Sequence, residues 1–435
     1  MGTDLFYGLL AEQLLLGLLL ALMLLEMLKA NPRIADALVK LVLIAACAVL
    51  LRQYAQGYDV NPLPGEIRID RFALVAKLVL LGSALLLSLV SSVSATFKSG
   101  FLICSSLLGA LIVMDSAGFI PLFIGIEMLS LPAFALMVNG TGTTSASEGA
   151  FKYLVLSSIA TALLLFGIAF GYGITGTLTV EGFARAVGAG SAPAVAAGLL
   201  VASGFFLKAA VFPFHGWAPD AYSSARLQVT SFLASIVKGA VILALVRIFG
   251  GVGLNSATVA IIAVLSLLSI FYGNFAAIKQ RNFKRLLAYS SISHAGYMLV
   301  AFVDTTGGRV SDLLWYVAIY ASTVIVACAS FSILCPGERD DVQSTDGAFQ
   351  SHPVAALVFG LAMLSLAGLP PLPGFFAKLF IFSSVIASQY LVVAIIAFVG
   401  SFIGVTYYLA LFFRLFATDP RTASADSSQS GTLMK

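Results

Sequence analysis

Five ionisable side chains lie inside long apolar runs of this sequence, where a charge is expensive. Even on lenient insertion scales, a charged side chain at the centre of a bilayer costs about 2.5–3.5 kcal/mol. These side chains are Glu127, Lys208, Lys238, His294 and Lys378. A buried lysine loses much of its preference for the charged form, so successive lysines can hold and release a proton. The set therefore indicates a proton path, with the histidine as a relay.

Two of the apolar runs that carry these lysines are interrupted by proline. The first interrupted stretch reads GFFLKAAVFPFHGWAPD (204–220), and the second reads GLPPLPGFFAK (368–378). The residues predicted to break the two helices are Pro213, Pro219, Pro370, Pro371, Pro373 and Gly374. An opened membrane helix frees carbonyl and N–H groups that can hold water beside a lysine. We therefore expect two broken helices, each next to one lysine of the path.

Several other ionisable residues are weaker candidates. Lys77, Lys98 and Lys152 lie nearer the ends of apolar runs, where long side chains reach the interface, and snorkelling is the prediction for all three. Lys152 is also a secondary candidate for the proton path. His215 follows the first break, and two interpretations stay open for it. Its ring either lines the proton uptake route or only bonds backbone freed by the break.

The same residues argue against several other chemistries. A metal site would need clustered histidine, cysteine or carboxylate ligands, and a nucleophilic triad would need a Ser–His–Asp set in a cleft. The cysteines are scattered and are predicted to be small apolar fillers: Cys47, Cys104, Cys328 and Cys335. The sequence shows no iron–sulfur, haem, flavin or nucleotide motif. We expect neither a cofactor, nor a metal, nor a redox centre on this chain.

The elements that position these residues must be membrane helices. Of the 435 residues, 60% are hydrophobic and only 10% are charged, with a mean hydropathy of +1.02. Soluble domains have about 25% charged residues. Apolar runs near 20 residues recur along the whole chain, and each is long enough to cross a hydrocarbon core of about 30 Å as a helix. The prediction is an all-α polytopic membrane protein with about 13 transmembrane helices.

The two predicted breaks lie five spans apart, and an odd offset reverses direction through the membrane. This is typical of inverted repeats, so we expect two inverted five-helix repeats, each with one broken helix. The predicted divisions are an N-terminal three-helix extension (1–96), a first antiporter-like repeat broken near 204–220 (97–250), a second repeat broken near 353–388 (251–417) and a polar C-terminal tail (418–435).

Basic loops predict the orientation of the chain. The loop KQRNFKR (279–285) is the most basic short connection, and such loops face the cytoplasm. Counting spans in both directions from this loop places the N-terminus outside and the C-terminus in the cytoplasm. The expected location is the bacterial inner membrane, as a multi-pass protein.

Several stretches resemble the antiporter-like membrane subunits of respiratory complex I, most closely the NADH-quinone oxidoreductase subunit N type. They are GIEMLSLPAFAL (125–136), FFLKAAVFPFHGWAPDAY (205–222), FLASIVK (232–238), YGNFAAIKQRNFKRLLAYSSISHAGYML (272–299) and MLSLAGLPPLPGFFAKLFIF (363–382). The resemblance covers roughly residues 70–417. It departs from the family at SSARLQVTS (223–231), where a proline-containing turn is usual, and in showing thirteen spans where fourteen are usual.

The resemblance implies a role for each residue of the path. Glu127 is implied to be the ion-pair partner of Lys208, the modulated lysine of the first half-channel. Lys238 is implied to be the central connecting lysine. Lys378 would serve the second half-channel, with His294 on the polar axis between the halves. FMN, iron–sulfur clusters and quinone are implied for partner subunits, which include a neighbouring antiporter-like subunit.

The resemblance implies a proton-translocating membrane-arm subunit of a respiratory NADH:quinone oxidoreductase, driven by quinone reduction in other subunits. Three alternatives to this function stay open. A subunit of a multi-subunit Na⁺(cation)/H⁺ antiporter would use the same fold and the same lysines. A stand-alone solute carrier would place polar, solute-binding residues in its broken helices. A structural spacer would tolerate the loss of the buried lysines.

Overall fold

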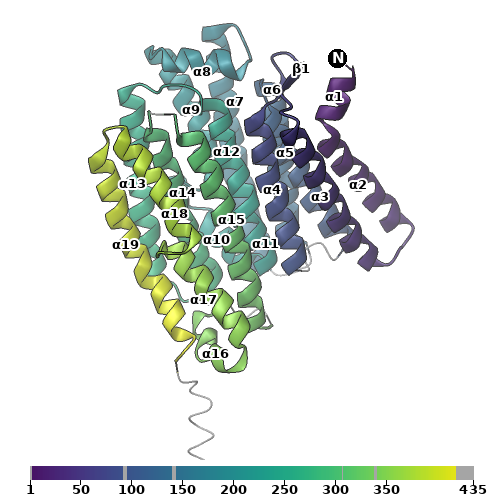
Figure 1. Ribbon diagram of the computed structural model, residues 1–435, viewed down its shortest axis with the longest axis vertical. Helices are drawn as coiled ribbons and strands as arrows, with labels where there is room; N and C mark the ends of the chain where they lie inside the picture. The colour runs from purple at the N-terminus through teal and green to yellow at the C-terminus, as the bar shows by residue number, and fades with distance from the viewer. Residues whose placement is uncertain (1, 92–95, 140–143, 306, 338–339, 418–435) are drawn as a thin grey trace, which may run out of the picture.

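The computed structural model describes residues 2–91, 96–139, 144–305, 307–337 and 340–417. The predicted polar tail at 418–435 lies outside the described residues. Within them the chain forms a bundle of helices, with α2 and α3 at one edge and α13 and α19 at the other (Figure 1). The short helix α8 (Val180–Gly188) lies at the end of the bundle that also holds the N-terminus.

Twelve helices of the described chain are long and apolar enough to cross a membrane. They are α2 (Leu10–Met27), α3 (Pro32–Ala55), α4 (Arg71–Val90), α5 (Phe97–Asp115), α6 (Phe119–Val138), α7 (Thr144–Thr175), α9 (Ala192–Ala209), α11 to α12 (Leu227–Phe249), α13 (Ser256–Ile278), α14 with its final 3₁₀ turn (Phe283–Val303), α15 (Arg309–Leu334) and α19 (Leu391–Arg414). Two shorter apolar helices, α17 (Pro353–Ala367) and α18 (Pro373–Ala387), form one broken crossing. Twelve crossings plus this one equal the predicted thirteen.

The remaining elements are short and lie outside the spans. They are α1 (Gly2–Gly8), the strands β1 (Val60–Leu63) and β2 (Ile67–Ile69), α10 (Ala218–Ser224), a 3₁₀ turn at Val342–Thr345 and α16 (Ala348–Ser351). The two strands pair antiparallel in the segment that connects α3 with α4. The Asp70 side chain accepts a hydrogen bond from the Ala73 N–H (2.9 Å) and caps the start of α4. The hairpin therefore fixes where the third long helix begins.

Two pairs of neighbouring helices, five spans apart, pack through glycine. A Cβ atom on Gly109 of α5 would lie 2.6 Å from the Gly125 carbonyl oxygen of α6. A Cβ atom on Gly296 of α14 would lie 2.7 Å from the Ser266 carbonyl oxygen of α13. Glycine is needed at both places because the backbones approach so closely. The same packing device at equivalent places agrees with an internal repeat, although its exact boundaries stay predictions.

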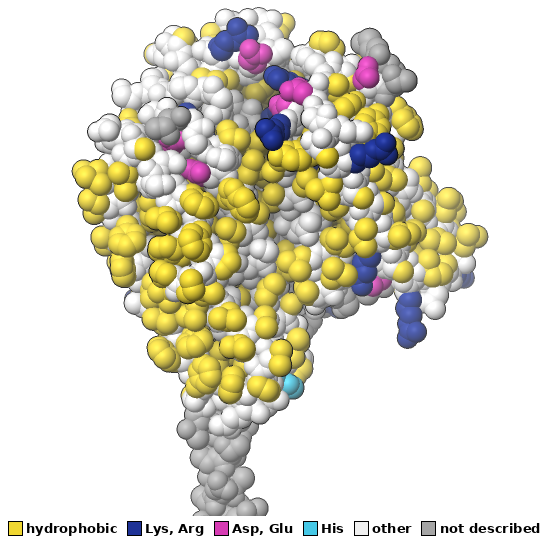
Figure 2. All heavy atoms as spheres, viewed as in Figure 1, with side chains coloured by type: hydrophobic (Ala, Val, Ile, Leu, Met, Phe, Trp, Pro, Cys, Tyr) yellow, Lys and Arg dark blue, Asp and Glu magenta, His cyan; other side chains and the backbone are white. Residues whose placement is uncertain are grey.

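The surface of the bundle is apolar around its middle. Figure 2 shows hydrophobic side chains covering the flanks of the visible face, with most of its lysine, arginine and acidic side chains near one end. The exposed apolar residues come mainly from the outer helices, for example Phe166 of α7 and Phe402 of α19. In contrast, α11 to α12 and α14 are almost entirely buried. These two innermost spans carry Lys238 and His294, so both residues lie away from lipid.

Candidate functional site: a buried polar axis

The first part of the site is an ion pair between α6 and α9. Lys208 Nζ lies 3.2 Å from Glu127 Oε1 and 3.0 Å from each of the Ser130 and Ser157 hydroxyl oxygens. Thr161 donates a hydrogen bond to the same glutamate oxygen (2.7 Å). The ammonium therefore keeps three oxygen partners in a low-dielectric setting. Of these three, only Glu127 carries a formal charge, so a change at this residue alters the electrostatics at Lys208 most.

The second part is Lys238, at the point where α11 runs into α12. The five residues before it, Leu233–Val237, form a π-helical turn, a deviation often found at functional sites. Lys238 Nζ donates to the Ser291 carbonyl oxygen (2.9 Å) and lies 2.8 Å from the Ser291 hydroxyl oxygen. No carboxylate forms a salt bridge with it within the described residues. Lys238 is therefore held by neutral dipoles alone, unlike Lys208.

A run of hydroxyl groups connects the middle of α14 with its neighbours. His294 Nδ1 lies 2.9 Å from the Tyr316 hydroxyl of α15, and His294 Nε2 lies 3.3 Å from the Tyr408 hydroxyl of α19. Tyr408 is in turn hydrogen-bonded to Ser290, the residue before the partner of Lys238. Histidine, tyrosine and serine each both accept and donate, so protons can be passed along such a chain.

The third part is Lys378 on α18, directly after the second break. Its Nζ donates to the Ala367 carbonyl (2.9 Å) and the Leu366 carbonyl (3.3 Å), and lies 2.8 Å from the Ser401 hydroxyl oxygen. The same Nζ lies 4.8 Å from the centre of the ring of Tyr297, which is on α14 together with His294. Lys238, His294 and Lys378 are therefore all in contact with α14 or part of it, and together with the Glu127–Lys208 pair we call them the polar axis.

Comparison with known proteins identifies the family of this chain. The family model described as NADH:quinone oxidoreductase/Mrp antiporter, transmembrane, matches residues 116–404. The chain is 56% identical to NADH-quinone oxidoreductase subunit N of Pelobacter propionicus over 423 residues, which are 97% of this chain and 91% of that protein. The chain belongs to this family. The resemblance drawn from the sequence motifs is therefore confirmed.

Two solved structures place this family member among its relatives. A chain of respiratory complex I from Thermus thermophilus superposes with a TM-score of 0.83 at 32% identity, covering 98% of this chain and 96% of that chain. A chain of the Mrp complex from Dietzia sp. superposes with a TM-score of 0.85 at 21% identity, covering 95% and 81%. At 21% identity the second likeness shows the fold alone. The all-α, antiporter-like fold expected from the sequence is confirmed.

The two breaks satisfy their freed backbone in different ways. The residues that directly follow α9 and α17, Ala210 and Gly368, are both in the left-handed conformation. At the first break, the Trp217 indole N–H donates to the Leu207 carbonyl (2.8 Å). At the second, Lys378 itself binds the freed carbonyls. The predicted helix breakers divide accordingly. Pro213 lies in the first break and Pro219 in the first turn of α10, whereas Pro370 and Pro371 lie in the second break and Pro373 and Gly374 begin α18.

Gly374 allows the two halves of the second broken helix to approach each other. A Cβ atom on it would lie 1.8 Å from the Ser365 carbonyl oxygen of α17. We expect Gly374→Ala to destabilise the protein by about 1–3 kcal/mol, because backbone on both sides has to shift. The measurement is the melting temperature of the purified complex. Gly17→Ala is the matched control, since nothing lies within 4 Å of its added methyl group. An unchanged melting temperature for Gly374→Ala would contradict this packing argument.

The two secondary candidates lie away from the axis. Lys152 is 42% exposed and forms 2.8 Å ion pairs with Glu148 and Asp220, as a snorkelling lysine would. The other oxygen of Asp220 lies 3.3 Å from Arg285 at the start of α14. The ring of His215 is half-buried against Tyr272, with centroids 4.3 Å apart. Its Nδ1 is buried without a hydrogen-bond partner in the described chain.

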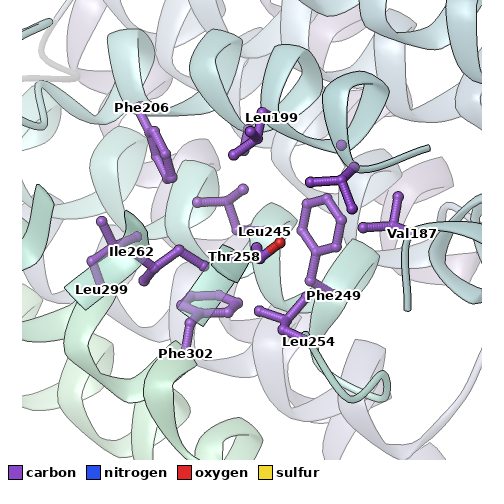
Figure 3. Close-up of a pocket in the computed structure, with 13 residues that line it drawn as sticks. Val187, Leu199, Phe206, Leu245, Phe249, Leu254, Thr258, Ile262, Leu299 and Phe302 are labelled. Carbon is purple, nitrogen blue, oxygen red and sulfur yellow. The ribbon is translucent and has the colours of Figure 1, made fainter. Parts of the chain in front are cut away.

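An apolar cavity of about 30 Å³ lies between α9, α12, α13 and α14, and none of the path residues lines it. Figure 3 shows Phe206, Leu245 and Leu299 projecting toward this space, with Thr258 as the labelled residue that carries an oxygen. The volume would admit a water molecule, yet a buried water needs two to four polar partners. We conclude that this cavity is not the proton route.

The sequence motifs missed most of the neutral members of the axis. Ser291, Tyr297, Tyr316, Tyr408 and the Trp217 cap were not among the predicted site residues. Three aromatic side chains also form one cluster at the first break. Trp217 lies 4.9 Å from Tyr153 and 6.1 Å from Tyr222, measured between ring centroids. The available signal was the polar run SSISH (290–294) inside an otherwise apolar helix.

Proposed function

We propose that this chain is a proton-translocating membrane-arm subunit of a respiratory NADH:quinone oxidoreductase. The observation that carries the proposal is the buried axis itself. A glutamate–lysine pair, two further lysines and a histidine lie in the interior of one bundle, and hydroxyl groups connect their neighbours. The 56% identity to a subunit N over nearly the whole chain supports the same assignment.

The pair Glu127–Lys208 sets the first step of the proposed mechanism. While the pair is closed, the carboxylate stabilises the proton on Lys208 by Coulomb attraction. The Glu127 side chain is 23% exposed, whereas that of Lys208 is 5% exposed, so the glutamate is the partner that can move or be neutralised. Opening the pair removes the attraction, and the proton on Lys208 becomes easier to release.

The later steps follow the polar axis. The proton moves toward Lys238 past the rings of Tyr153 and Tyr222, with water completing the connection. From Lys238 it passes through Ser291 and the neighbouring Ser290–Tyr408 pair to His294. Lys378 then receives it and releases it to the outside. The chain supplies proton-holding groups only, and electron transfer belongs to FMN, iron–sulfur clusters and quinone in partner subunits.

The orientation is part of the proposal. The N-terminus would lie outside a bacterial inner membrane and the C-terminus in the cytoplasm, following the basic loop at 279–285. The network of Lys152, Asp220 and Arg285 would then lie at the cytoplasmic end of α7 and α14, where protons are taken up. Other membrane-arm subunits, including a neighbouring antiporter-like one, would flank the chain and deliver the signal that opens the pair.

Replacement of Glu127 by glutamine tests the proposed first step. The amide keeps the size of the side chain but removes the charge that stabilises the proton on Lys208. We expect the ratio of protons translocated to quinone reduced to fall, because transfer through this chain slows by roughly tenfold, equivalent to about 1.4 kcal/mol. Both quantities are measured together in native membrane vesicles.

The matched control is Glu26→Gln on α2. Its side chain is 43% exposed and lies 3.9 Å from Lys98, outside the axis. The control variant is expected to keep the full ratio. If Glu127→Gln also keeps the full ratio in an assembled complex, the ion pair does not gate a proton path and the proposed mechanism is wrong.

A further inference from the structure

A second buried ionic cluster lies outside the polar axis, between α2, α4 and α5. Lys77 Nζ lies 2.8 Å from Glu12 Oε1 and 2.8 Å from Asp115 Oδ2. The lysine side chain is 0% exposed and that of Asp115 is 2% exposed. The prediction that Lys77 snorkels is therefore wrong, because its ammonium is held inside the bundle by two carboxylates. All three residues precede residue 116, where the match to the family model begins.

The charges of this cluster do not balance when all three groups are ionised. Two carboxylates face one ammonium, which leaves one negative charge in a buried place. An uncompensated buried charge is strongly unfavourable in proteins. The ionisable groups that act on Asp115 are Lys77, Glu12 and Arg247 of α12. Within the described residues, the further cation that acts on Asp115 is therefore Arg247.

Arg247 does not supply the missing charge, because it is engaged elsewhere. Its Nη1 lies 2.6 Å from Asp70 Oδ2, and its other nitrogens donate to the Ser116 carbonyl (2.8 Å) and the Arg68 carbonyl (3.0 Å). Asp70 Oδ2 also lies 3.8 Å from Arg68 Nε, which in turn lies 3.9 Å from Asp59 Oδ1. The sum over the connected groups therefore stays at one negative charge: Glu12, Asp115, Asp70 and Asp59 against Lys77, Arg247 and Arg68.

The free oxygens of the cluster show where a further positive charge is missing. Glu12 Oε2 and Asp115 Oδ1 are both buried and have no hydrogen-bond partner within the described part of the chain. A buried anionic oxygen without a donor pays the full desolvation cost. Protonation of one carboxyl group removes both problems, since it cancels the excess charge and supplies an O–H donor.

We propose that Glu12, Lys77 and Asp115 form a buried proton-binding site that holds one exchangeable proton on a carboxyl group beside the charged lysine. A metal cation fits this site poorly, because the lysine ammonium already occupies the space between the two carboxylates and cannot act as a ligand. The site holds its proton whether or not the axis through Lys208 translocates protons, so this inference does not depend on the proposed function.

A hollow at the surface gives the site a route to water. A pocket of about 580 Å³ is lined by Asp70, Ser116 and Arg247, among other polar and apolar residues. Ser116 directly follows Asp115, so a residue of the pocket is the chain neighbour of the cluster. The lining also includes Arg68 and Thr179, whose polar side chains can bind water in the pocket. Proton exchange is therefore expected with the aqueous phase on the side where α2 and α4 begin.

Infrared difference spectroscopy of the intact complex tests the proposal. Spectra are recorded between neutral and alkaline pH, in H₂O and in D₂O. We expect a C=O band of a protonated carboxyl group that shifts in D₂O and is lost in both Asp115→Asn and Glu12→Gln. Asp59→Asn is the control, because that side chain is 57% exposed on the β1–β2 hairpin side. A spectrum that is the same in all variants overturns the proposal.

The assembly of the variants provides a second measurement. Asp115→Asn and Glu12→Gln each leave one carboxylate beside one ammonium, so both are expected to assemble at the level of the unsubstituted complex. Lys77→Met leaves two carboxylates with no cation and is expected to reduce assembly strongly. Failure of both neutral variants to assemble, with a normal Asp59→Asn control, overturns the charge balance argued above.

A third measurement separates a proton from a sodium ion. The melting temperature of the unsubstituted complex is compared in sodium chloride and in choline chloride at equal ionic strength. A proton site predicts the same value in both salts. A stabilisation by sodium that disappears in Asp115→Asn would show a cation site and would overturn the proposal of a bound proton.

Discussion

Complexes that carry Lys208→Ala are expected to lose the proton transfer that passes through this chain, by roughly 100-fold or more. Lys208 forms an ion pair with Glu127, and the hydroxyl groups of two serines are its other oxygen partners. Alanine removes the proton-holding group and leaves the glutamate carboxylate without its cation. The measurement is the number of protons translocated per quinone reduced, in vesicles with verified assembly of the complex.

The control for this variant is Lys98→Ala. The Lys98 side chain is 71% exposed, and its one described ion pair, with Glu26, is loose at 3.9 Å. It is expected to keep the proton-to-quinone ratio of the unsubstituted complex. A full ratio in an assembled Lys208→Ala complex would favour the structural-spacer reading and would exclude the path proposed above.

Lys238→Arg is expected to block proton transfer although the positive charge remains. Arginine cannot be deprotonated in proteins, so it can hold the hydrogen bonds to Ser291 but cannot pass on a proton. We expect a loss of roughly 100-fold or more in transfer through the chain, as for removal of a general acid–base group. Proton translocation and quinone reduction are again measured together.

This substitution separates two roles that an alanine variant would confuse. If Lys238 served only to place a positive charge beside α14, the Lys238→Arg variant would keep normal proton translocation. Lys279→Arg, at an exposed position in the loop before α14, is the matched control and is expected to be silent. Normal pumping by Lys238→Arg would therefore show that the central lysine does not carry a proton.

The path residues with a strong local signal were predictable from the sequence. Lysine inside an apolar run and proline next to it each violate the rules for a membrane helix, and the violation is visible without any structure. Lys208, Lys238 and Lys378 all lie in the interior of the bundle as expected. The two breaks occur at 210–217 and 368–372, between α9 and α10 and between α17 and α18.

The local sequence around Lys77 did not predict its buried ion pairs. Seven residues into α4, it resembles any lysine near the end of a span, and only its neighbours distinguish it. Its partners Glu12 and Asp115 are 65 and 38 residues away in the chain. Whether such a side chain snorkels or pairs depends on how three helices rotate against each other, which no window of sequence contains.

The sequence by itself determined that this is a membrane bundle with two broken helices and a set of buried lysines. Those features follow from hydropathy and from the cost of charge and proline in a helix, which are properties of short segments. Only the tertiary structure decided which neutral groups connect the lysines and that a second buried cluster exists. Ser291, Tyr316 and Tyr408 reach the axis from different helices. Contacts between distant helices are fixed by packing, because hydrogen bonds form only where side chains meet within about 3 Å.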